Sequence, residues 1–146
     1  MTNVPLFVNG DGMAGGSVHH TIAAYPFLGA ARTAPRYRFY SVRDAFPALW
    51  PTEEGGVAVV GELYDVPLEA IRDDFMAAEP PELELGVIEM EGGAAALAVL
   101  LRASAHVERT GLIEISAAAD WRAYRGITPS GDGADAAAQA GGTNLP

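Results

Sequence analysis

The chain of 146 residues contains no cysteine and no lysine. Without cysteine it can form no disulfide, no thiolate nucleophile and no cysteine-ligated zinc or iron–sulfur centre. Without lysine it can form no Schiff base with a carbonyl substrate and has no phosphate-loop lysine. A chain of this length buries about two thirds of its unfolded surface, so one hydrophobic core can hold it together. The absence of disulfides fits a reducing compartment, and we expect a cytoplasmic protein.

Long apolar runs and excess positive charge are also missing. No stretch reaches the roughly 18 apolar residues of a membrane span, and the N-terminus lacks the basic and apolar regions of a signal peptide. The formal net charge is −10, whereas contacts to nucleic-acid phosphates need a basic surface. We therefore expect neither nucleic acid nor membrane as a partner.

Short apolar or alternating runs predict a strand-rich chain. The expected strands cover residues 4–9, 27–33, 37–42, 57–66, 83–91 and 96–102. Gly92-Gly93 suits a hairpin turn between the last two strands. Residues 47–56 carry the prolines and glycines of a turn.

Helical patterns are fewer. Residues 67–78 predict the one clear helix, with a proline near its start and Pro80-Pro81 ending it. Residues 17–24 could form a short helix capped by Ser17, and residues 105–110 a helical turn.

This balance of elements predicts an α+β fold. We expect a small mixed β-barrel or strongly curved sheet with helices packed outside. Residues 1–126 would form one domain. Residues 127–146 are rich in glycine and alanine and have no apolar period, which is typical of a flexible tail.

Four segments, in this order, resemble one family. They are residues 6–13, residues 32–40 with Thr-x-Pro-x-Tyr-Arg, residues 60–66, and residues 115–124 ending in Trp-Arg-Ala-Tyr. Together they resemble the C-terminal domain of allophanate hydrolase, over roughly residues 4–125, a domain that is itself similar to γ-glutamylcyclotransferases. The resemblance implies the γ-glutamylcyclotransferase-like fold, a small carboxylate or amide as ligand, and no cofactor or metal.

The glycine-rich loop after the first strand is the first candidate site. In the cyclotransferases the matching loop holds the carboxylate and amine of the substrate, which implies a binding role for Asn9, Gly10, Asp11, Gly12 and Met13. The residues themselves allow either a loop whose N–H groups converge on an anion or a turn without a ligand. Asp11 would repel an anion unless an arginine holds it.

Glu79 follows the predicted helix, where the resemblance implies an acid/base glutamate. A general base of this kind needs a carboxyl whose pKa is raised by partial burial. The alternative is a solvated glutamate at a helix end.

Two arginines and a tyrosine complete the candidates. Arg38 and Arg122 lie in segments that the family brings together, and guanidinium groups suit carboxylate ligands. The alternative is a structural role, since most surface ion pairs contribute at most about 1 kcal/mol. The hydroxyl of Tyr64, on the predicted central strand, could reach a pocket. One of His19 and His20 could line the pocket, but adjacent histidines on a helix cannot chelate one metal.

Two classes of function remain open. The first is an enzyme acting on a small carboxylated amide, with Glu79 as acid/base. The resemblance implies either a γ-glutamyl compound, cyclised to 5-oxoproline, or the product of an amidase step in urea degradation. The second is a non-catalytic module that binds a small anion or partners a separately encoded amidase. A homodimer, typical of the family, is also open.

Overall fold

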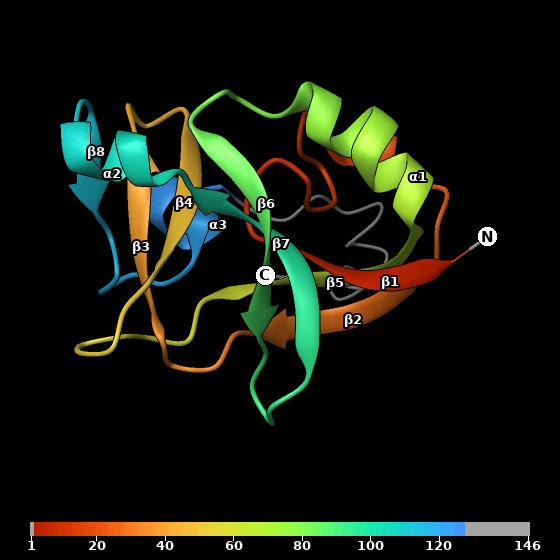
Figure 1. Cartoon of the computed structure of the whole chain (residues 1–146), viewed down its shortest axis with the longest axis horizontal. Coiled ribbons are helices and arrows are strands. Elements are labelled where there is room, and N and C mark those ends of the chain that lie inside the picture. Colours follow the sequence, from red (N-terminus) through yellow and green to blue (C-terminus); the bar gives the residue numbers. More distant parts are fainter. Residues whose placement is uncertain (1, 128–146) are drawn as a thin grey trace.

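One mixed sheet of eight strands forms most of the structure, a computed structural model that describes residues 2–127 (Figure 1). The sheet curls into a half-barrel with a few helices around it, which confirms the predicted α+β fold class. The strands are β1 (Asn3–Val8), β2 (Phe27–Arg32), β3 (Tyr37–Val42), β4 (Phe46–Pro51), β5 (Val60–Pro67), β6 (Leu83–Glu89), β7 (Ala95–Leu101) and β8 (Leu112–Glu114).

The helices are short, and one helical segment is longer than the others. That segment runs through α1 (Leu68–Ala70), the π turn η2 (Ile71–Phe75) and the 3-10 turn η3 (Met76–Ala78). The remaining helical elements are the 3-10 turn η1 (His19–Thr21), α2 (Ala103–Glu108) and α3 (Trp121–Arg125). No helix of the described residues is long and apolar enough to cross a membrane.

Two strands, β1 and β4, share one edge of β7. The strand order is β2-β5-β1-β7-β4-β3-β8, and β6 pairs with the other edge of β7. Both β1 and β4 run parallel to β7: Leu6 pairs with Leu97, and Leu49 pairs with Leu100. Because β1 ends where β4 begins on this edge, the chain after β1 must leave the sheet there. The loop that leaves is the glycine-rich one.

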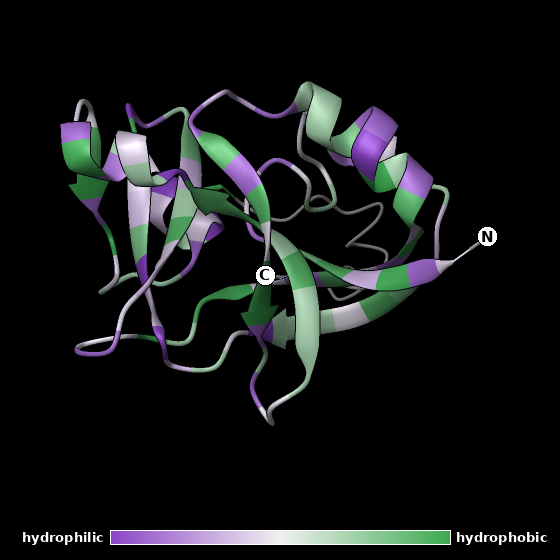
Figure 2. Cartoon of the chain, in the orientation of Figure 1, coloured by the Kyte–Doolittle hydropathy of each residue, from purple (hydrophilic) through white to green (hydrophobic). Residues whose placement is uncertain are grey.

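The core lies inside the curl of the sheet and under the helical segment. On β1, Leu6 and Phe7 are buried, as is typical of a strand with partners on both edges. The helical segment buries Ile71 and Phe75, four residues apart, and exposes the residues between them. Figure 2 shows hydrophilic residues on the outer side of this segment.

The structure corrects one strand prediction. Residues 47–56 were predicted to be a turn, but the first part of this range belongs to a strand. β4 occupies residues 46–51 and pairs with β3 along its whole length. The two prolines lie near the ends of β4 and flank Leu49, the residue that pairs with β7. Proline is tolerated near strand ends, so it is a weak turn signal there. The actual turn between β3 and β4 is formed by Arg43 and Asp44, both with positive φ.

Other element boundaries also differ from the prediction. The helix expected over residues 17–24 is only the 3-10 turn η1, and Val18 rather than Ser17 precedes it, without a side-chain cap. The strand expected over residues 57–66 begins at Val60, and Val57 makes a single bridge to Tyr37. The helix over residues 67–78 and the β6–β7 hairpin are confirmed. Apart from Ile127, the predicted tail lies outside the described residues.

Candidate functional site

A cavity of about 160 Å³ lies where β1 ends and β4 begins. Its walls come from the end of β1 and the glycine-rich loop, the start of β4, the end of the helical segment, and β7. Its apolar lining includes Val8, Phe46, Phe75, Leu83 and Val99. Its polar lining comprises Asn9, Asp11, Ser17 and Glu79, with backbone of the loop glycines. An engineered cavity of about 150 Å³ in another protein binds benzene, so this cavity suits a ligand fragment of roughly six non-hydrogen atoms.

The loop can pass so close to the strands only because of its glycines. A Cβ added to Gly10 would lie 2.6 Å from Cδ of Pro47, and one added to Gly12 would lie 2.9 Å from Cγ1 of Val8. Both distances are shorter than real Cβ contacts. The glycines therefore allow the loop backbone, rather than side chains, to form one wall of the cavity.

The loop backbone leaves hydrogen-bond donors available. The N–H of Met13 donates to the carbonyl of Gly10, and the N–H of Val18 donates to the carbonyl of Asp11, each at 3.0 Å. Within residues 2–127, no acceptor bonds the N–H groups of Gly10, Asp11 or Gly12. These three residues line the cavity. The loop can thus supply N–H donors to a carbonyl oxygen or an oxyanion of a ligand.

Glu79 also lines the cavity, at the end of the helical segment. Its backbone is extended, and its N–H donates to the carbonyl of Met76 at 3.1 Å, which ends the helix before Pro80. Burial of the side chain and, to a smaller extent, the nearby Asp11 carboxylate together raise the pKa of Glu79 to about 7. A carboxyl of this kind can both take and give a proton near neutral pH.

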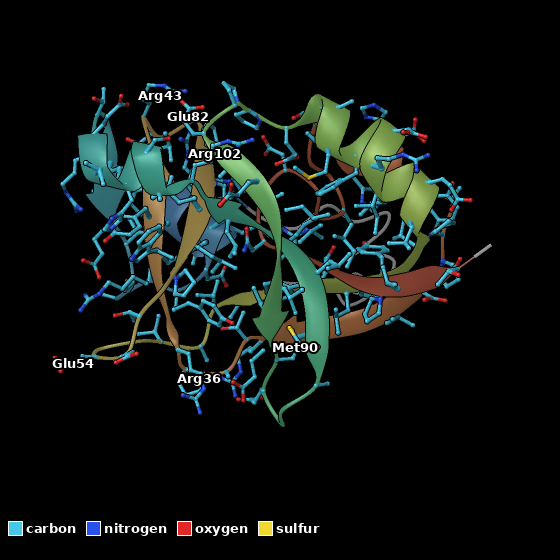
Figure 3. All side chains as sticks on the ribbon, viewed as in Figure 1. Arg36, Arg43, Glu54, Glu82, Met90 and Arg102 are labelled. Carbon is cyan, nitrogen blue, oxygen red and sulfur yellow. The ribbon has the colours of Figure 1, made fainter. Side chains whose placement is uncertain are left out.

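Arginines fix the chain immediately after Glu79. Arg43 pairs with Glu82 at 2.6 Å, and Nε of Arg102 donates to the carbonyl of Pro81 at 2.7 Å. Figure 3 shows Arg43, Glu82 and Arg102 together near the start of β6. These bonds hold the segment that follows Glu79 against β7 and the β3–β4 turn, so the position of Glu79 is fixed from both sides.

Behind the glycine-rich loop lies a buried polar cluster. Oε1 of Glu62 accepts hydrogen bonds from the N–H of Ala14 and the hydroxyl of Tyr64, both at 2.9 Å. Arg122 lies 3.3 Å from Oε2 of Glu62 and donates to the carbonyl of Ala14 at 2.6 Å. Burial, followed by the neighbouring Glu62 carboxylate, raises the pKa of Tyr64. The cluster binds the peptide groups on both sides of Ala14 and so anchors the loop to β5 and α3.

The candidate residues predicted from the sequence fall into two groups, those that line the cavity and those that do not. The structure brings Asn9, Gly10, Asp11, Gly12 and Glu79 to one cavity. Substrate binding by them remains a prediction.

Two further candidates lie behind the loop rather than in the cavity lining. They are Tyr64 and Arg122, whose polar groups are engaged with Glu62 and Ala14. Glu62 was missed from the sequence. Its signal was a glutamate inside the apolar run of β5, two residues from Tyr64 and so on the same face of the strand.

Arg38 lies elsewhere. It pairs with Glu114 at 3.0 Å and donates to the carbonyl of Glu54 at 3.0 Å, on the outer surface of β3. It does not line the cavity, and its carboxylate partner is Glu114, whereas that of Arg122 is Glu62. Ligand binding by Arg38 and Arg122 stays a prediction.

Met13 and the histidines also lie outside the cavity lining. Met13 is buried in the core, and a ring nitrogen of His19 lies 2.9 Å from the carbonyl of Gly12. His20 is exposed and bonds the carbonyl of Ser17. In the part of the chain that the structure describes, no group of three or more acidic or histidine side chains could hold a metal ion.

Residues 4–126 match the model of the allophanate hydrolase C-terminal domain. The chain belongs to this family. No curated protein sequence matches the chain.

Solved structures share the fold of this chain. A uropathogenic E. coli-specific protein is 30% identical, with a TM-score of 0.78, over 86% of this chain and 98% of that one. An allophanate hydrolase from Kluyveromyces lactis is 23% identical, with a TM-score of 0.76, over 86% of this chain but 21% of that enzyme. A mouse AIG2-like protein shares the fold at 21% identity and a TM-score of 0.52, over 71% and 79% of the two chains. The predicted resemblance to the allophanate hydrolase C-terminal family is confirmed, and the mouse protein shares its fold.

Proposed function

We propose that the cavity binds a small amide and that Glu79 carries a proton during its conversion. The observation that carries the proposal is the pairing, in one cavity, of a glutamate whose pKa is about 7 with a loop that has three N–H groups without acceptors in residues 2–127. Perturbed carboxyls in clefts are typical of acid/base sites. Membership of the allophanate hydrolase C-terminal family is compatible with an amide or carboxylated amide as substrate.

The chemistry follows from the loop and Glu79, which both line the cavity. The carbonyl oxygen of the amide would accept hydrogen bonds from the N–H groups of Gly10, Asp11 or Gly12. An amine of the same molecule would attack the carbonyl carbon, and Glu79 would take the proton that this nitrogen loses. Glu79 would then return the proton to the leaving nitrogen as the original C–N bond breaks. The products are a lactam, which is 5-oxoproline for a γ-glutamyl compound, and a free amine.

Turnover of a defined panel tests this proposal. The panel contains γ-glutamyl dipeptides, allophanate, biuret and small amino amides, and the assay measures release of amine or ammonia. We expect Glu79→Gln to lose about 10² to 10⁴-fold of the activity that the wild type shows, as is typical for removal of a general base. Glu53→Gln, which changes an exposed glutamate outside the cavity, serves as the matched control. Full activity of Glu79→Gln on every substrate that the wild type converts would contradict the proposal.

A second candidate function is an accessory module of a separate amidase. It is favoured by the K. lactis allophanate hydrolase, in which a region of this fold makes up part of a larger enzyme. Size-exclusion chromatography of the chain with an allophanate hydrolase that lacks its own C-terminal domain tests this function. Co-elution would support it, and separate elution at all concentrations would count against it.

A further inference from the structure

The charged side chains that line the cavity are both acidic. They are Asp11 and Glu79, and the Asp11 carboxylate is near enough to raise the pKa of Glu79. None of the nine arginines lines the cavity, although all nine lie within the described residues. A ligand carboxylate placed here would meet Asp11 and Glu79 without a cation to compensate its charge. The loop N–H groups alone would have to offset that repulsion.

A neighbouring groove is acidic as well. A groove that shares Ala78 with the cavity is lined by Asp73 and Asp74, and His20 is its one basic side chain. Arg72, which precedes these acids, donates two hydrogen bonds to Asp73, at 2.6 and 2.7 Å. Its charge is therefore already paired at the surface.

Asn9 supplies an independent sign of a ligand. It is 4% exposed, and it lines the cavity. Its carboxamide forms no hydrogen bond with residues 2–127, and its polar atoms are not sealed in the core, so they open onto the cavity. A ligand with both a donor and an acceptor could bond both polar atoms of this carboxamide.

We propose that the ligand is an amide that also carries an ammonium group, held between Asp11 and Glu79, and that the site rejects dianions. The amide end would meet Asn9 and the loop N–H groups, whereas the ammonium would lie between the two carboxylates. This inference rests on the proposed function for the role of Glu79, and it narrows the substrate class from carboxylated amides to amino amides. A bound cation also favours the carboxylate form of Glu79, which can accept one proton from the ammonium and leave the neutral amine that attacks. The proton that the attacking nitrogen then loses passes to the leaving nitrogen as the C–N bond breaks.

Calorimetric titration with three probes of similar size tests the inference. Glycinamide carries the ammonium, propionamide has a methyl group in its place, and oxamate is an anion. We expect glycinamide to bind about tenfold more tightly than propionamide and oxamate to bind most weakly, as one favourable charge contact in a partly buried site predicts. In Asp11→Asn the preference for glycinamide should fall towards one. Asp65→Asn, on β5, is the matched control and should keep the preference.

A second readout separates the cation site from a general loss of structure. Near neutral pH, binding of glycinamide should release protons from Glu79, seen as a binding enthalpy that depends on the ionisation enthalpy of the buffer. Propionamide should release none, and Glu79→Gln should abolish the release. A thermal melt of Asp11→Asn verifies that the variant is folded.

The outcomes distinguish this inference from the proposed function. Tighter binding of oxamate than of glycinamide, an unchanged preference in Asp11→Asn, or no binding of any probe overturns the inference. If glycinamide binds as expected but the wild type converts no amide, the proposed function fails and the cation site stands. If only anionic amides are converted, and in a Glu79-dependent way, the cation site fails and the proposed function stands.

Discussion

Replacing Glu79 by glutamine should stabilise the protein at high pH, in a way that can be worked out from the structure. Below about pH 4.5 the carboxyl is protonated in both the folded and the unfolded chain, so it contributes no difference. Between 4.5 and about 7 the unfolded chain loses this proton while the folded chain keeps it, so stability falls as pH rises. Above about pH 7 the full cost of the buried charge is present and no longer changes.

The magnitude follows from the size of the pKa rise. A rise from 4.5 to about 7 corresponds to roughly 3 kcal/mol. The side chain of Glu79 is only partly buried, and solvent screening reduces this figure to roughly 2 kcal/mol of unfolding free energy. Glutamine has nearly the same shape and no charge. Glu79→Gln should therefore raise the melting temperature by roughly 4–8 °C above about pH 7, in proportion to the free energy.

The assay is thermal unfolding of wild type and variant at about pH 8, 6 and 4.5. The difference in stability between the two proteins at each pH reports the ionisation of Glu79 alone, because all other titrating groups are common to both. We expect a stabilisation that is largest at pH 8, smaller at pH 6 and close to zero at pH 4.5. Glu53→Gln removes an exposed carboxylate elsewhere and should stay within about 0.5 kcal/mol at each pH. Equal stability of Glu79→Gln and wild type at pH 8 would refute the reasoning.

Three further changes test other parts of the structure. Gly10→Ala places a Cβ 2.6 Å from Pro47 and should destabilise by about 1–3 kcal/mol and weaken ligand binding, measured by urea unfolding and calorimetry. Glu62→Ala leaves the half-buried Arg122 without its carboxylate and should cost about 3 kcal/mol or more in urea unfolding; an unchanged midpoint would show that the cluster does not anchor the loop. Arg38→Ala removes a partly exposed ion pair. It should lower the free energy of unfolding by at most about 1 kcal/mol and leave ligand binding unchanged; loss of binding would show that Arg38 is part of the ligand site.

Part of the fold follows directly from local patterns in the sequence. The continuous apolar run on β1 predicts a central strand, and the glycines after it predict a loop, because both signals are local. The same holds for the helix that ends before Pro80 and places Glu79. The strand β4 was missed because Pro47 and Pro51 are turn signals unless the partner strand is known.

The partners of the charged groups could not be read from the sequence. Arg122 and Glu62 meet across the fold, on α3 and β5, and nothing local joins them. In the same way, the pairing of β3 with β8 brings Glu114 to Arg38, and neither segment alone predicts that pairing. The polarity of the cavity is likewise a property of the assembled chain, because Asp11 and Glu79 come from distant segments.

Titration of Glu79 by NMR tests the central claim most directly, namely that this carboxyl exchanges a proton near neutral pH within the cavity. Protein with ¹³C-labelled glutamate side chains would be titrated, and the Glu79 signal assigned by its loss in Glu79→Gln. We predict one glutamate with a midpoint near pH 7, and a lower midpoint in Asp11→Asn because a neighbouring negative charge is removed. A Glu79 signal that titrates at the ordinary value for glutamate, about 4.3, would contradict the account.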